Sequence, residues 1–187
     1  MTAGATRTRA DAVRNYERVL KAAAEVLAEK GADAAVPEIA ARAGVGKGTV
    51  YRCFPTKAHL VGAVVAERVR GYTGLIDAAA ERPDAWEAFA ALLGEWAERQ
   101  ATDCTFAEGL AHDYTLPEMR DAKAEMYAAL ERLIARAKEQ GRMRADVGAD
   151  DVRVMFGGMS RVLRADRNRD PAAWRRHAAL VVAAFRA

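Results

Sequence analysis

Apolar residues recur at helical spacing along almost the whole chain, and this periodicity constrains the fold more than any other feature. One such face consists of Val13, Tyr16, Leu20, Ala23 and Leu27, and Gly31 then supplies a helix stop signal. No segment alternates apolar and polar residues for long enough to favour a strand. The sequence therefore predicts an all-α protein of about nine helices.

Proline and glycine divide this pattern into separate helices. Pro37 lies in the first turn of a short predicted helix over 36–43, where its missing N–H costs nothing. Gly44-Val45-Gly46 makes a turn before a second short helix, and Thr56 can cap a long helix that runs from about Lys57 towards Ala80. The second short helix and the later helices are expected at about 47–54, 83–99, 103–114, 117–140, 150–165 and 171–186.

Composition excludes several classes of protein. Charged residues interrupt every apolar run before it reaches the roughly 18–20 residues that a membrane span needs. Residues 1–10 lack the apolar stretch of a signal peptide. The two cysteines, Cys53 and Cys104, make no disulfide framework, and their role stays open. These features point to the cytoplasm.

The charge is unevenly placed along the chain. Residues 1–60 carry ten Lys or Arg against six Asp or Glu, a surplus of four, whereas the remainder carries one net negative charge within a total of +3. A basic first third on a near-neutral body is typical of a nucleic-acid-binding head. A solvated surface would also account for so small a surplus.

Two short helices joined by a tight turn predict a helix-turn-helix near residues 36–57 that docks on double-stranded DNA. In that arrangement the first helix braces against the DNA backbone and the second lies in the major groove. Gly44 permits the turn conformation, and Gly48 lets the backbone of the second helix come close to DNA. The residues expected to face inward are Ile39, Ala40, Val45, Val50 and Phe54.

The expected DNA contacts lie around the second short helix. They are Lys47, Gly48, Thr49, Tyr51, Arg52 and Lys57, with the helix N-terminus at Lys57 as a further anion site. Any one of them alone could be a surface charge or a core-edge aromatic, so the prediction rests on their joint spacing. Arg7 and Arg9 could reach a minor groove or belong to a disordered terminus.

One stretch of the sequence resembles the signature of the TetR family of repressors. It reads Ile39-Ala40-x-x-Ala43-Gly44-Val45-x-x-Gly48-Thr49-Val50-Tyr51-x-x-Phe54-x-x-Lys57-x-x-Leu60. The resemblance covers residues 12–71. It implies a DNA-binding domain at 12–71, with the helix-turn-helix at about 35–54, and a ligand-binding and dimerisation domain at 72–187. By position it implies that Lys47 and Thr49 lie at bases or adjacent phosphates, that Tyr51 and Lys57 grip the backbone, and that Arg52 faces the DNA.

The chain also departs from the family pattern at three places. Ala34-Ala35-Val36-Pro37 stands where a capping Thr is frequent, Gly46 where a Ser is frequent, and Cys53 where a His is common. The first departure removes a hydroxyl that would cap the helix and touch phosphate. These differences bear on base specificity and leave the docking mode intact.

Large apolar and aromatic side chains between residues 80 and 160 suggest a ligand pocket, because helical bundles place small-molecule sites between their helices. The candidates are Trp96, Phe106, Tyr114, Tyr127 and Met159. At helical spacing, each of them could equally be an ordinary core residue.

The last two predicted helices carry apolar stripes that we interpret as a dimer face, as in TetR-like proteins, where these helices pair with those of a partner. The stripes are Val152, Met155, Phe156, Met159 and Leu163, then Trp174, Ala178, Val181 and Phe185. Gly157 and Gly158 stand in the middle of a predicted helix, where each glycine costs roughly 1 kcal/mol of helix stability relative to Ala. Such a cost is easiest to understand where two helix backbones approach each other closely. The alternative is that both stripes face the chain's own core.

These features together predict a homodimeric transcriptional repressor, released from a palindromic operator when a small apolar or amphipathic ligand binds, with no metal or cofactor. One alternative is a TetR-like sensor or partner-binding protein that has lost DNA binding, for which the missing Thr is the support. An enzyme is the other alternative. His112-Asp113 lie close to Cys104, but no catalytic motif, phosphate loop or metal spacing accompanies them, so no enzyme is expected.

Overall fold

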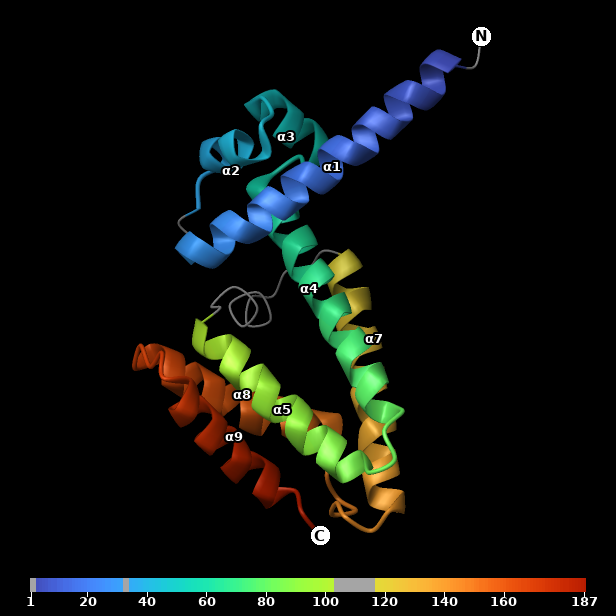
Figure 1. Ribbon diagram of the computed structural model, residues 1–187, viewed down its shortest axis with the longest axis vertical. Helices are drawn as coiled ribbons and strands as arrows, with labels where there is room; N and C mark the ends of the chain where they lie inside the picture. The colour runs from blue at the N-terminus through green and yellow to red at the C-terminus, as the bar shows by residue number, and fades with distance from the viewer. Residues whose placement is uncertain (1–2, 32–33, 103–116) are drawn as a thin grey trace.

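A computed structural model describes residues 3–31, 34–102 and 117–187, and within these ranges the chain forms eight helices and no strand (Figure 1). The helices are α1 (Ala3–Lys30), α2 (Val36–Ala43), α3 (Lys47–Cys53), α4 (Lys57–Ala80), α5 (Ala85–Thr102), α7 (Pro117–Glu139), α8 (Ala149–Ala165) and α9 (Pro171–Ala184). The all-α prediction is confirmed. The helix predicted at 103–114 lies outside the described residues, and no described helix is long and apolar enough to span a membrane.

Local signals set the bounds of α2, α3 and α4. Gly44 ends α2 in the left-handed conformation, with a φ of 63°, and its N–H donates to the carbonyl of Ala41 at 3.1 Å. Thr56 caps α4, because its hydroxyl oxygen accepts a hydrogen bond from the His59 N–H at 3.2 Å. The predicted capping role of Thr56 and the predicted turn at Gly44 are both confirmed.

Helix α1 differs from its prediction at its start and on its inward face. It begins at Ala3, so the backbone at Arg7 and Arg9 is helical rather than an extended arm or a disordered terminus. Of the apolar face predicted for this helix, Val13 and Tyr16 are exposed. Figure 1 shows the physical reason, since the first half of α1 projects beyond α2 and α3.

Two apolar cores meet on α4. The head core comprises the buried apolar residues of α1, α2 and α3, among them Val19, Ala23, Leu27, Ile39, Val50 and Phe54, together with Leu60 and Val64 of α4. The body core begins at the next residue, Val65, and includes the buried residues of α5, α7, α8 and α9. Figure 1 shows α4 running from one region into the other. Residue 71, where the sequence suggested a domain boundary, therefore lies inside a helix that continues from the head core into the body core.

Aromatic side chains fill the body core. Phe89 of α5 is fully buried and lies between Trp86 and Phe185, with each pair of ring centroids 6.1 Å apart. Trp174 of α9 is also fully buried, and its indole N–H donates to the carbonyl of Asn168 at 2.9 Å. The Phe89–Phe185 contact joins α5 to the end of α9, and the Trp174 bond ties the start of α9 to the connector that precedes it.

Candidate DNA-binding face and ligand pocket

The head core holds α3 by one side and leaves its other side open. Val50 and the following Phe54 are buried against Ile39 and its neighbours, and the Tyr16 ring lies 4.7 Å from that of Phe54. Of the residues expected to face inward, Ile39, Ala40, Val50 and Phe54 are buried and Val45 is half-buried. The opposite side of α3 is left facing solvent.

The sequence-predicted DNA contacts lie on this open side. Lys47, Gly48, Tyr51 and Arg52 are exposed on α3, and Lys57 is exposed in the first turn of α4. The sixth, Thr49, is half-buried, and its hydroxyl accepts a hydrogen bond from the Arg52 guanidinium at 3.3 Å. We call these six residues the DNA-facing surface, after the contacts that the sequence predicts for them.

Gly48 has no structural reason within this chain to be glycine. A Cβ placed on it would meet no atom within 4 Å, and its backbone does not adopt a positive φ. The fold would therefore accept a side chain at position 48. The packing of the described residues thus gives no reason for glycine at position 48.

Two arginine side chains that no sequence motif marks out hold the helix-turn-helix in place. Arg18 of α1 donates to the carbonyl oxygens of Ala43 at 2.7 Å and Gly44 at 3.2 Å, which ties α1 to the turn. Arg42 of α2 forms a two-pronged pair with Glu29, with both contacts at 3.0 Å, and this lowers the pKa of the Glu29 carboxyl. Lone arginines in helical patterns give no signal of such roles.

The start of α2 is capped without the threonine that the family usually has. Ala35 provides no side-chain cap, but the Glu38 carboxylate accepts a hydrogen bond from the Ala35 N–H at 3.3 Å. The hydrogen bond from Lys30, followed by that from the Ala35 N–H, lowers the pKa of Glu38. The helix terminus is thus satisfied from within, although the hydroxyl that could touch phosphate is absent.

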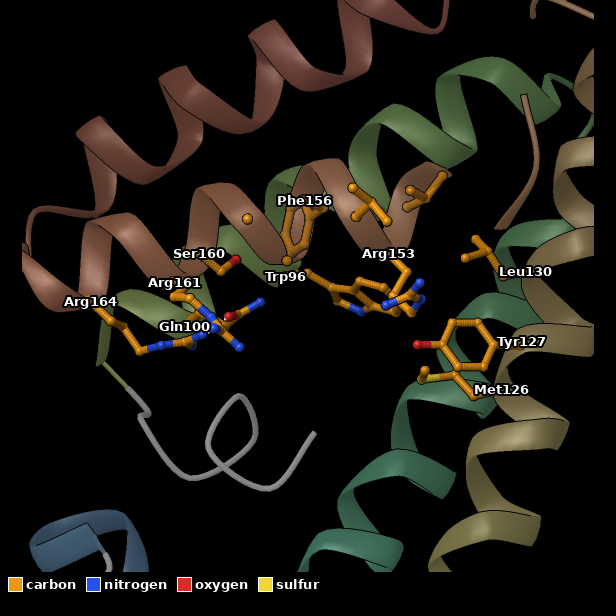
Figure 2. Close-up of a pocket in the computed structure, with 14 residues that line it drawn as sticks. Trp96, Gln100, Met126, Tyr127, Leu130, Arg153, Phe156, Ser160, Arg161 and Arg164 are labelled. Carbon is orange, nitrogen blue, oxygen red and sulfur yellow. Dashed lines mark hydrogen bonds between the residues drawn. The ribbon is translucent and has the colours of Figure 1, made fainter. Parts of the chain in front are cut away.

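A pocket of about 500 Å³ lies between α5, α7 and α8 (Figure 2). Its lining residues are Trp96, Gln100, Met126, Tyr127, Leu130, Val152, Arg153, Val154, Phe156, Gly157, Gly158, Ser160, Arg161 and Arg164. Of the ligand-site candidates from the sequence, Trp96 and Tyr127 lie in this pocket. Met159 packs against the body core and does not line it, and Phe106 and Tyr114 lie outside the described residues, as does Cys104.

Polar groups of the pocket were missed by the sequence analysis. Gln100 is buried, and its side-chain oxygen accepts a hydrogen bond from Arg164 at 2.9 Å. Burial raises the pKa of the Tyr127 phenol, against a smaller opposing effect of the nearby Arg153. The overlooked signal was Ser160 on the apolar side of a helix, flanked by arginines at helical spacing.

Most of the predicted dimer stripe faces the chain's own core, so that prediction is corrected. Val152, Phe156, Leu163, Trp174, Ala178 and Phe185 are buried in the body core. Met159 and Val181 are partly buried, and only Met155 is exposed. The exposed large apolar residues of α8 and α9 are Val154, Met155, Val162 and Leu180. The strongest apolar stripe faces inward, because it supplies the body core that a chain of this length needs.

Two family models match the chain, one over each core. Residues 19–64 match the bacterial regulatory proteins of the tetR family, and residues 84–187 match the C-terminal domain of SbtR-like transcriptional regulators. The second match alone spans more than half of the chain. The chain belongs to the TetR family of transcriptional regulators. It is therefore a transcriptional regulator with a DNA-binding helix-turn-helix, a class that does not usually act as enzymes.

Individual relatives agree with this assignment. The HTH-type transcriptional regulator YvdT of Bacillus subtilis is 32% identical over 131 residues, which is 65% of this chain and 66% of that protein. A TetR regulator from Mycobacterium vanbaalenii is 35% identical, with a TM-score of 0.61 over 86% of this chain and 96% of that one. The TetR regulator SCO0520 of Streptomyces coelicolor is 26% identical, with a TM-score of 0.66 over 91% and 98%. All three relatives are transcriptional regulators.

In the ranges 3–31, 34–102 and 117–187, no group of three or more His, Cys, Asp or Glu side chains comes together in a way that could hold a metal ion.

Proposed function

We propose that this TetR-family regulator is a repressor that leaves its operator when a small molecule occupies the pocket between α5, α7 and α8. The observation that carries the proposal is the path from that pocket to the head. Trp96 lines the pocket and makes an edge contact with Tyr72 of α4, with ring centroids 5.2 Å apart. About two to three turns earlier in α4, Val64 and Leu60 belong to the head core that holds α3.

The DNA-facing surface supplies the contacts in this proposal. Helix α3 enters the major groove, with Lys47 and Thr49 at bases or adjacent phosphates and Arg52 on the DNA side. Tyr51 and Lys57 hold the phosphate backbone, and Gly48 lets α3 approach it. The side chains on the opposite face of α3 are buried, so the docking face is fixed before DNA arrives.

A homodimer completes the proposal, since a two-fold pair presents two copies of α3 to a palindrome with half-sites one or more DNA turns of about 34–36 Å apart. The exposed apolar residues Val154, Met155, Val162 and Leu180 offer the contact surface. A Cβ at Gly157 or Gly158 would meet no atom within 4 Å, which leaves room for another helix to approach α8 closely.

Ligand release follows if the ligand prefers a different tilt of α4. Occupancy would move Trp96 and Tyr72, α4 would tilt, and the spacing of the two α3 helices would no longer match the operator. The change in operator affinity then equals the ligand's preference for the tilted form.

The test combines deletion of the gene with genome-wide recovery of DNA bound by the protein. We expect bound fragments next to genes whose transcript levels rise when the regulator gene is deleted, because a repressor lowers the transcription of the genes it controls. Falling transcripts at those genes would show an activator and contradict the proposal. Recovery of no fragment above background would instead favour a sensor that has lost DNA binding.

A further inference from the structure

The pocket between α5, α7 and α8 has two chemically different ends. Figure 2 shows Arg161, Arg164 and Gln100 gathered at one end, with Ser160 beside them, and Met126, Tyr127 and Leu130 at the other. Trp96 and Phe156 lie between the two ends, with ring centroids 6.2 Å apart. A ligand with a polar head and a largely apolar body would match this division.

Two buried donors in this pocket have no partner. The Trp96 indole N–H and the Ser160 hydroxyl have no hydrogen-bond partner in the described part of the chain, although these residues are only 6% and 2% exposed. Buried polar groups are nearly always paired, so each unpaired one calls for an explanation. Both line the same pocket, and the Ser160 hydroxyl lies beside Gln100, Arg161 and Arg164, where an acceptor atom in the polar head of a ligand would pair with it.

The charged side chains that line the pocket, among the described residues, have one sign, with Arg161 and Arg164 at the Gln100 end and Arg153 near Tyr127. Arg153, Arg161 and Arg164 line the pocket, and none of its fourteen lining residues is Asp or Glu. Arg153 pairs with Asp150 at 2.7 Å, whereas Arg161 forms no ion pair within the described residues. Arg164 already donates one N–H to Gln100, and this contact orients its guanidinium at the Gln100 end of the pocket. A carboxylate suits this end, because guanidinium groups bind carboxylates with paired, charge-assisted hydrogen bonds.

The sequence of α8 produces this arrangement. One face of the helix carries four residues at intervals of four, three and four positions, namely Arg153, Gly157, Ser160 and Arg164. Phe156 and Arg161 lie beside this face. From α5, Trp96 and Gln100 stand one turn apart and face the same space. The polar end is thus built from two helices that the body core holds together.

We propose that the ligand of this pocket is an amphipathic monoanion, an apolar body that carries one carboxylate. The carboxylate binds Arg161 and Arg164 and accepts from the Ser160 hydroxyl. The body lies across Trp96 and Phe156 towards Met126 and Leu130. A volume of about 500 Å³ is that of a small-molecule site. This inference rests on the proposed function only in taking this pocket as the effector site.

The test measures how tightly the full-length protein binds decanoate, decanol and decylamine. These probes share one chain length and differ in the charge of the head group. Calorimetry and tryptophan fluorescence measure the binding. We expect decanoate to bind about tenfold or more tightly than decanol, and decylamine to bind most weakly. Arg161→Gln with Arg164→Gln should abolish the preference for decanoate over decanol. Arg144→Gln, an exposed arginine outside the pocket, is the matched control and should keep it.

Ser160→Ala provides a second measurement that does not depend on the arginine variants folding. Removing an unpaired buried hydroxyl should raise the unfolding temperature of the ligand-free protein and weaken decanoate binding severalfold. A Ser160 with only a structural role would not change the decanoate-to-decanol ratio.

Equal affinities for the three probes, or an unchanged preference in the double arginine variant, would overturn the anion inference. DNA binding is measured separately in the same samples. Decanoate that binds with the expected preference but leaves DNA affinity unchanged would contradict ligand release and leave the anion inference standing.

Discussion

Gly48→Glu is expected to weaken DNA binding by about a hundredfold or more while leaving the unfolding temperature close to that of the parent. A Cβ at position 48 meets no described atom within 4 Å, so the substitution should leave the fold intact. It places a carboxylate between α3 and the phosphates, and like charges brought together at an interface cost several kcal/mol. Fluorescence anisotropy with duplex DNA and thermal unfolding measure the two quantities.

Gly74→Glu is the matched control for this experiment. Gly74 is an exposed helical glycine of α4, a Cβ there also meets no atom within 4 Å, and the substitution changes the net charge by the same amount. It should leave DNA affinity within about threefold of the parent, since that difference is below the 1.4 kcal/mol of a tenfold change. Equal losses from both variants would mean that net charge, and not the DNA-facing surface, sets the affinity.

Trp174→Ala is expected to destabilise the protein by about 3–5 kcal/mol, the usual cost of truncating a buried aromatic residue. Trp174 is fully buried in the body core, and the substitution also leaves the Asn168 carbonyl without its indole donor. Urea denaturation followed by circular dichroism measures the loss. The loss should persist at every protein concentration, because the contacts lie within one chain.

Leu180→Ala separates core packing from dimer contact on the same helix. Leu180 is 57% exposed on α9, so its truncation should cost about 0.5 kcal/mol or less within a single chain. Any larger effect should shrink as protein concentration rises, as expected for a weakened dimer. A loss as large as that from Trp174→Ala and independent of concentration would contradict the burial described here.

Local chemistry made the head predictable from the sequence. Pro37 at the start of α2, Gly44 at its end and Thr56 before α4 act within one turn of the residues that they control, so the bounds of the helix-turn-helix follow from neighbouring residues. The open face of α3 could be predicted as well, because Val50 and Phe54 are large apolar residues that are buried on the opposite side of the helix. Which residues touch bases is still a prediction.

Tertiary packing made the body harder to predict. A stripe such as Val152, Phe156 and Leu163 shows that α8 has an apolar face but not whether that face meets its own chain or another copy. Arg18 and Arg164 look alike in the sequence, yet one holds the turn of the head and the other lines a pocket. Their roles depend on residues 25 and 64 positions away, which no local pattern reveals.

The most direct test of the account is the salt dependence of binding to duplex DNA that flanks the protein's own gene. The account predicts that log affinity falls steeply and linearly with log salt concentration, through release of counterions from the phosphates. Lys57→Ala should reduce that slope by about one, whereas Lys138→Ala on α7 should leave it unchanged. An affinity that does not vary with salt, or a slope that Lys57→Ala leaves intact, would contradict the assignment of this surface to the DNA backbone.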